Sequence, residues 1–242
     1  MSFSIRSVSQ FAGLAVLATA AVTGSANAGN GLSIQFSVDN AAPAIFNPSG
    51  TDQGSYFNYS GFESDLSTYT LGYDINADAE PAVNFLNGNI VIQNIDVVSH
   101  TYSITFILPI SAFRPGSLLG GSVAGGLTTD FDGGSLSTVG QGSVWSALIN
   151  GNVVATLLNG PASWGKAGAG SVDIPGESFG DPIPSLPGPA VSGSIAVNLT
   201  FTLTAGDSAS FTSIFVVESI PAPATLALLG LAGFVGGRRR RA

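Results

Sequence analysis

Apolar residues recur at every second position through much of this chain, and this pattern constrains the fold more than any other feature. In residues 32–38 the apolar positions are Leu32, Ile34, Phe36 and Val38. The same alternation returns in residues 67–75 and 101–110, and Pro109 indicates that the second of these runs ends there or lies at a sheet edge. Since successive side chains of a strand point to opposite faces, each run predicts a strand with one buried face.

Turn residues separate these runs and add more strands. Asn150 and Gly151 lie midway between two apolar segments, and both residue types accept the positive φ of a type I′ turn, so residues 144–158 predict a hairpin. A second hairpin is expected around Ala205, Gly206 and Asp207. Other expected strands are 55–62, 89–98, 117–129, 194–204 and 209–217. Five prolines between residues 174 and 190 predict a long surface loop without regular structure.

No amphipathic helix of ordinary length is apparent between residues 29 and 219. About 190 residues can bury a sizeable core as one domain, so the lack of cysteine in the sequence is no obstacle to folding. Many short strands without a helical partner predict an all-β protein. We expect residues 29–219 to form a single antiparallel β-sandwich that is jelly-roll-like, because no fixed-period repeat suggests a propeller or solenoid.

Residues 1–28 have the three regions of a secretory signal peptide. Arg6 supplies the positive charge, residues 11–22 form the apolar region, and Ala26 and Ala28 are the small residues expected before a cleavage site. A buried N-terminal helix is the alternative. The leader predicts export by way of signal peptidase.

Residues 220–242 form a second targeting segment. Residues 220–237 carry no charge, which is long enough for a short membrane helix. Four basic residues follow: Arg238, Arg239, Arg240 and Arg241. Arginines are costly to move across a bilayer, so they should stay on the cytoplasmic side and leave the residues before Pro221 outside. A plain C-terminal tail anchor is the alternative to a sorting signal.

The order of prolines, apolar helix and arginines at the chain end resembles the PEP-CTERM sorting signal of exosortase substrates. Pro221 and Pro223 match its proline pair, and Ala222 stands where the family usually has Glu. The body is also similar to such proteins in residues 78–81, 101–110 and 206–212. The resemblance implies cleavage by an exosortase and delivery to the cell surface or extracellular matrix, within exopolysaccharide, in a structural or adhesive role.

The charge balance excludes some partners. Of 7 basic residues, Arg6 and the four terminal arginines lie in the targeting segments, which leaves Arg114 and Lys166. All 15 acids remain, so residues 29–219 carry 2 − 15 = −13. A surface this acidic repels nucleic acid and anionic lipid, and we expect neither as a partner of the domain.

Few residues suggest catalysis. The only histidine, His100, is expected to be an ordinary turn residue, and no Gly-x-Ser-x-Gly elbow occurs. A carbohydrate-active enzyme could use a pair of carboxylates for catalysis. Among fifteen acidic residues some pair is always present, so the pair alone does not indicate catalysis. Asp130 and Asp132 are expected to cap backbone amides in a turn. We therefore expect no enzyme, and a secreted carbohydrate-active or carbohydrate-binding protein is the alternative.

Calcium is the one cofactor that the sequence suggests. Oxygen-bearing residues alternate at Asp74, Asn76, Asp78 and Glu80, the spacing with which an EF-hand loop begins. The motif then departs, because Ala79 and Phe85 occupy the positions of its Gly and its bidentate Glu. We therefore expect no cofactor and interpret these residues as solvated side chains along a strand, with a calcium-binding surface module as the alternative.

Thr200, Thr202 and Thr204 form a row that resembles ice-binding arrays. Ice recognition needs such rows on adjacent strands, and the sequence shows one. A β-favouring solvent face is the simpler interpretation.

Overall fold

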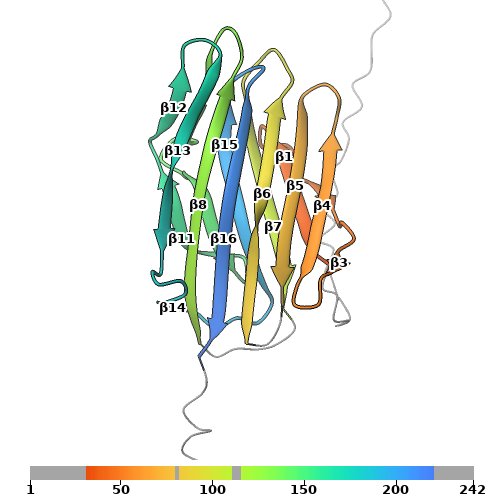
Figure 1. Ribbon diagram of the computed structural model, residues 1–242, viewed down its shortest axis with the longest axis vertical. Helices are drawn as coiled ribbons and strands as arrows, with labels where there is room; N and C mark the ends of the chain where they lie inside the picture. The colour runs from red at the N-terminus through yellow and green to blue at the C-terminus, as the bar shows by residue number, and fades with distance from the viewer. Residues whose placement is uncertain (1–30, 80–81, 111–115, 221–242) are drawn as a thin grey trace, which may run out of the picture.

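The computed structural model describes residues 31–79, 82–110 and 116–220, and this part of the chain consists of strands and turns. It contains sixteen β-strands in two antiparallel sheets, and the described residues include no helix (Figure 1). The all-β class predicted from the alternating pattern is confirmed, and the two sheets are compatible with the predicted sandwich.

The first sheet, which we call sheet A, has the order β11-β10-β15-β7-β1-β2, and β9 joins β15 to β12. Its strands are β1 (Ser33–Val38), β2 (Ala44–Phe46), β7 (His100–Pro109), β9 (Gly134–Ser137), β10 (Ser143–Ile149), β11 (Asn152–Asn159), β12 (Ser163–Lys166) and β15 (Ser194–Leu203).

The second sheet, sheet B, has the order β13-β8-β16-β6-β5-β4-β3, and β14 also pairs with β8. Its strands are β3 (Thr51–Asp52), β4 (Phe57–Ser64), β5 (Tyr69–Asp78), β6 (Val83–Asn94), β8 (Ser117–Thr129), β13 (Gly170–Phe179), β14 (Leu186–Gly188) and β16 (Ser208–Ser219).

The sheets pack face to face through the alternating apolar residues of their central strands. Phe201 of β15 and Phe211 of β16 are both buried, and their ring centroids lie 5.2 Å apart. Trp145 of β10 meets Phe215 of β16 edge-on, at 6.4 Å between ring centroids. Removing these large side chains from water is the main favourable term in folding.

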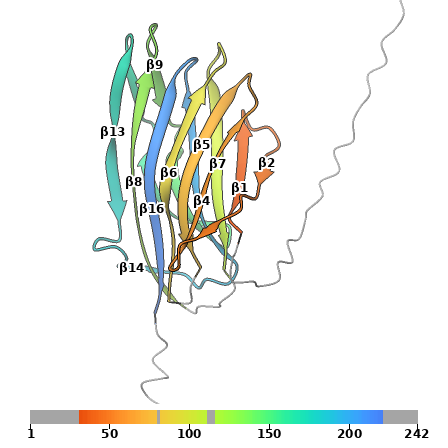
Figure 2. The same cartoon turned by 45° about the vertical axis from the view of Figure 1, so that its right-hand side comes forward.

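The two ends of the sandwich differ. β15 ends and β16 begins at the turn of residues 204–207, and β7 begins at the same end, because Leu203 pairs with His100. We call this the turn end. β16 finishes at the opposite end, where Ser219 pairs with Ser117, and β1 also starts there (Figures 1 and 2). The first and last described strands therefore meet the rest of the chain at one end of the domain.

Several local predictions are confirmed. The alternating residues of 32–38, 67–75 and 101–110 fall in β1, β5 and β7, and β7 ends at Pro109 as expected. The hairpin of β10 and β11 turns through Asn150 and Gly151, with φ of 52° and 79°, as a type I′ turn requires.

Two predictions are wrong. The turn through Asp207 is not a hairpin, because β15 belongs to sheet A and β16 to sheet B, so the chain crosses the core there. The proline-rich segment is not a loop throughout, since it contains part of β13 and all of β14. Both strands pair with β8 alone and therefore lie at the edge of sheet B, and a register shift after Ile174 accommodates Pro175. Proline has no backbone N–H, but at a sheet edge this removes no hydrogen bond between interior strands.

The connectivity combines two patterns. β4, β5 and β6 follow one another as a meander within sheet B. The chain then alternates between the sheets through β7, β8 and β9.

Candidate functional site

The two targeting segments predicted from the sequence lie outside the described residues. This applies to Ala26 and Ala28 of the leader, and to Pro221, Pro223, Arg238, Arg239, Arg240 and Arg241 of the tail. Within the residues that the structure does describe, no helix has the length and apolar character needed to cross a membrane. Ile220, the last described residue, follows β16 directly.

The calcium candidates lie on a strand rather than in a loop. Asp74, Asn76 and Asp78 occupy alternate positions of β5, and Glu80 lies outside the described residues. Alternate side chains of a strand are about 6.6 Å apart and run parallel, so they do not wrap one ion as a loop does. Asn58 of β4 donates its amide to Asp74 Oδ1 at 2.6 Å and to Asn76 Oδ1 at 2.9 Å. This is the strand placement favoured from the sequence, in which alternate side chains project from the sheet, and the Oδ1 atoms of Asp74 and Asn76 already accept from Asn58.

A second group of carboxylates lies at the turn end. The backbone amide of Asp132 donates to Asp130 Oδ1 at 3.2 Å, so Asp130 caps an amide in this turn as predicted. Asp207 is fully buried and accepts from the Asp130 amide at 3.1 Å and from the Thr204 hydroxyl. The hydrogen bond with Asp132 raises the pKa of Asp130. Among the described residues, no three His, Asp or Glu side chains converge closely enough to hold a metal ion.

His100 bridges two turns through both of its ring nitrogens. Nδ1 lies 2.6 Å from Asp39 Oδ2, in the turn after β1, and Nε2 lies 2.9 Å from Asp96 Oδ2, in the turn after β6. Two carboxylate partners require a proton on each nitrogen, so His100 is an imidazolium in this arrangement. Neither nitrogen is then free to take a proton from a nucleophile, and the residue joins turns instead of merely occupying one.

The charges of this bridge support one another. Partial burial lowers the pKa of His100, but the hydrogen bonds with Asp96 and Asp39 raise it by more, so the net shift is upward. The Thr101 amide and then His100 lower the pKa of Asp39, whereas His100 and then the Val97 amide lower that of Asp96. All three groups are thus held in their charged forms.

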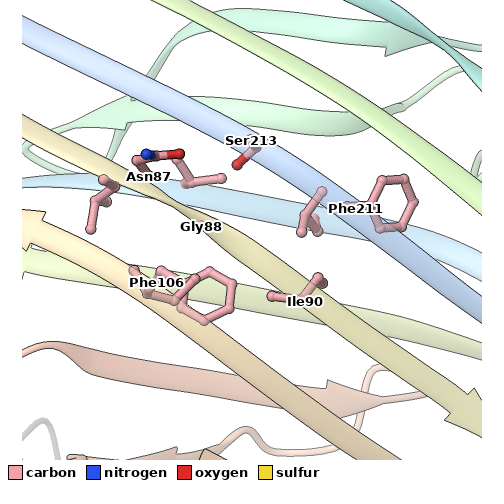
Figure 3. A pocket seen from close by; sticks show the side chains of 10 residues that line it. Asn87, Gly88, Ile90, Phe106, Phe211 and Ser213 are labelled. Atoms are coloured by element: carbon pink, nitrogen blue, oxygen red, sulfur yellow. The ribbon is translucent and has the colours of Figure 1, made fainter. Parts of the chain in front are cut away.

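A small cavity lies between the two sheets in the described part of the core. Figure 3 shows Asn87, Gly88 and Ile90 of β6 and Phe211 and Ser213 of β16 around it, with Phe106 of β7 from the opposite sheet. Its volume of about 10 Å³ is at the lower limit for a single water molecule, so it does not suit an organic ligand.

The outer surface of sheet A carries an ordered array of small polar side chains, which we call the hydroxyl face. Pairing of β1, β7, β15, β10 and β9 aligns its members in three rows across the sheet. The rows are Thr101, Thr202 and Ser137; Ser37, Ser103 and Thr200; and Gln35, Thr105, Asn198 and Ser146. Thr200 and Thr202 of the threonine row seen in the sequence therefore have neighbours on adjacent strands, whereas Thr204 lies after β15 and donates to the Ser135 carbonyl and to Asp207.

Hydrogen bonds hold the centre of the hydroxyl face in place. Asn198 Nδ2 donates to Thr105 Oγ1 at 2.8 Å and to Ser103 Oγ at 3.1 Å. Thr200 donates to Asn198 Oδ1 at 2.8 Å, and the Thr101 and Thr202 hydroxyls lie 2.9 Å apart. These contacts fix the rotamers, so the array does not have to be ordered when a partner binds.

Acidic residues are divided unequally between the two sheets. Seven carboxylates lie on the strands of sheet B: Asp52, Glu63, Asp74, Asp78, Asp173, Glu177 and Glu218. The eight described strands of sheet A contain no carboxylate. The residues on these strands that can carry a positive charge are His100 and Lys166. Because residues 29–219 carry −13, the hydroxyl face is an uncharged surface on an acidic protein.

Sequence reasoning recognised Thr200 and Thr202 but missed their partners Thr101, Ser103 and Thr105. The signal was present, since these residues alternate with the buried apolar residues of β7, but the pairing that joins the strands spans about 100 positions.

Searches of known protein families and of curated proteins find no match to this chain.

Proposed function

We propose that this chain is an exported, non-enzymatic protein of the cell surface or extracellular matrix, with a structural or adhesive role. Its jelly-roll-like sandwich lies between a signal peptide and a C-terminal sorting helix, and an exosortase processes the tail at the Pro221-Pro223 segment. The mature domain needs no cofactor. The alternative to a domain without a cofactor is one that binds calcium weakly through the carboxylates of sheet B. The alternative to a non-enzymatic role is a carbohydrate-active enzyme.

The position of the two strands next to the targeting segments is the observation that carries this proposal. β1 starts and β16 finishes at the same end of the sandwich, so a tail that follows Ser219 leaves from that end. The turn end lies one strand length away, and twelve residues of β16 span about 40 Å. A domain tethered in this way presents its turn end and both sheet faces to the surroundings.

The bridge at His100 favours a structural role over an enzymatic one. Each ring nitrogen of the sole histidine is paired with a carboxylate, so the side chain connects two turns of the fold. This use accounts for the residue without catalysis.

The intact mass of the mature protein from its native host tests the proposal. We expect loss of residues 1–28 and a second cut close to Pro221 and Pro223, with the product at the cell surface. A variant with Arg238, Arg239, Arg240 and Arg241 replaced by serine should lose the second cut and keep the first. Full-length protein in the cytoplasm, with both ends intact, would refute the proposed function.

A further inference from the structure

We infer that the hydroxyl face of sheet A is a binding surface for an uncharged polysaccharide. The inference rests on the proposed function in one respect, since export is what brings the protein into contact with the polysaccharides of a matrix. It adds a site and a ligand class that the targeting segments do not supply.

The charge of the domain limits the partners that the hydroxyl face can bind. A polymer bearing carboxylates or sulfates is repelled by a domain of charge −13, and a cationic partner is drawn to the seven strand carboxylates of sheet B. An uncharged polymer meets neither effect. The surface without strand carboxylates is therefore the one on which a neutral partner loses least by displacing water, because ionised groups are the most costly to desolvate.

The polar groups of the hydroxyl face match those of a polysaccharide. Every hydroxyl on the face both donates and accepts hydrogen bonds, and each amide of Gln35 and Asn198 offers both kinds of atom. A polysaccharide presents the same mixture of donors and acceptors along its length. Because the face contains no row of a single polarity, sugar hydroxyls can replace water on it in either orientation.

The hydroxyl face is ordered and regularly spaced before a ligand binds. The side chains of the face are short, and hydrogen bonds among Ser103, Thr105, Asn198 and Thr200 already fix several of them. Binding therefore loses little side-chain entropy. The rows repeat about every 6.6 Å along the strands and about every 4.8 Å across them. A polymer with repeating units can contact several rows at once, and many weak contacts on one chain raise the overall affinity.

Two matched double variants test the site. Gln35→Glu with Asn198→Asp places two carboxylates in the longest row of the hydroxyl face without changing side-chain shape. Gln93→Glu with Asn89→Asp makes the same two changes on β6, where both residues are exposed on sheet B. The variants have equal net charge, so a difference between them reports the face and not the total charge.

The measurement is retardation of each protein, purified from its native host, in native gels containing dextran, soluble starch, galactomannan or hydroxyethyl cellulose. We expect the wild type to be retarded by at least one of these neutral polymers and not by alginate. The sheet A variant should bind about tenfold more weakly, since carboxylates buried by the ligand lack partners, and the sheet B variant should match the wild type. Urea unfolding of both variants confirms that each is folded.

Two results would overturn the inference: no retardation by any of the four neutral polymers, and equal weakening by both variants. In the first case, ice shaping by the same protein would assign the face to ice. Intact mass of the same samples reports sorting separately. Correct processing with no retardation refutes the binding site alone, and retardation with unprocessed ends refutes the proposed function alone.

Discussion

The side chain of Asn150, at the tip of the β10–β11 hairpin, accepts a hydrogen bond of 2.8 Å from the backbone amide of Gly193. The same oxygen accepts from Ser192 at 3.1 Å, and its amide nitrogen donates to the carbonyl of Ala190 at 3.0 Å. One residue therefore makes the turn and also attaches it to the segment that precedes β15.

This double role predicts how substitutions at Asn150 behave. Asn150→Gly keeps the positive φ but removes the side-chain bonds, so we expect it to lower the free energy of unfolding by about 2 kcal/mol. Asn150→Asp keeps the accepting oxygen and should lose less. Urea unfolding of both variants checks the order. A glycine variant as stable as the wild type would show that the bonds to residues 190–193 contribute nothing.

The His100 bridge predicts a stability that depends on pH. The folded pKa of His100 is raised, so its contribution is complete below the ordinary histidine value of about 6.5 and is lost as pH rises through the folded value. The folded pKa values of Asp39 and Asp96 are lowered, so their contribution is lost only as pH falls through them, below about 3.8. Nearby Asp65 stays charged at the pH values at which His100, Asp39 and Asp96 titrate. Burial raises the pKa of Asp65, but hydrogen bonds from the amides of Thr68, Ser67 and Tyr69 lower it by more, to about 2.

Melting temperatures of the wild type and His100→Gln across this range test the bridge. The wild type should exceed the variant by most between about pH 4 and pH 6.5, and the gap should close in alkaline solution. A gap that is constant with pH would mean that the imidazolium is not what the carboxylates recognise.

Contact between the sheets predicts a large effect at Phe211. Its buried ring packs on Phe201, and Phe211→Ala should cost about 3–5 kcal/mol of unfolding free energy. Phe131 is the control, because its side chain is 92% exposed in the turn after β8. Phe131→Ala should stay within about 0.5 kcal/mol of the wild type in the same denaturant titration.

Close approach of β5 and β6 predicts opposite effects at two glycines. A Cβ at Gly88 would lie 2.3 Å from the carbonyl oxygen of Asp74, so Gly88→Ala should cost about 1–3 kcal/mol. At Gly72 the nearest atom would be 4.0 Å away, and alanine there should be neutral or stabilising, because it restricts the unfolded chain. Thermal unfolding of the pair measures the difference. Equal melting temperatures would contradict the contact at Gly88.

Local pattern was sufficient to predict the long strands and insufficient for the short ones. The alternation in β1, β5 and β7 reflects one buried face, which any pairing partner would satisfy. β2, β3 and β14 have two or three residues each, too few for a periodicity, and they form because a neighbouring strand offers its edge. The hairpin expected through Asp207 is wrong because its sequence pattern is ambiguous. Two alternating runs joined by a tight turn have the same pattern whether the second strand pairs with the first or crosses to the other sheet.

The candidate site shows the same limit. Thr200 and Thr202 were visible as a row, but only the long-range pairing of β15 with β7 sets Ser103 and Thr101 beside them. His100 and Asp39 are 61 positions apart, and no local spacing links them. The restriction of strand carboxylates to sheet B depends on which strands join which sheet, and this is a property of the whole topology.

The position of β16 has a mechanical consequence. It is paired with β8 through twelve residues and with β6 through eleven, so both of its edges are occupied. A load applied beyond Ser219 and resisted elsewhere on the domain acts along this strand, across hydrogen bonds that lie perpendicular to it. Those bonds are sheared together and cannot open one after another like a zip, so a domain hung from this strand is well suited to bearing tension.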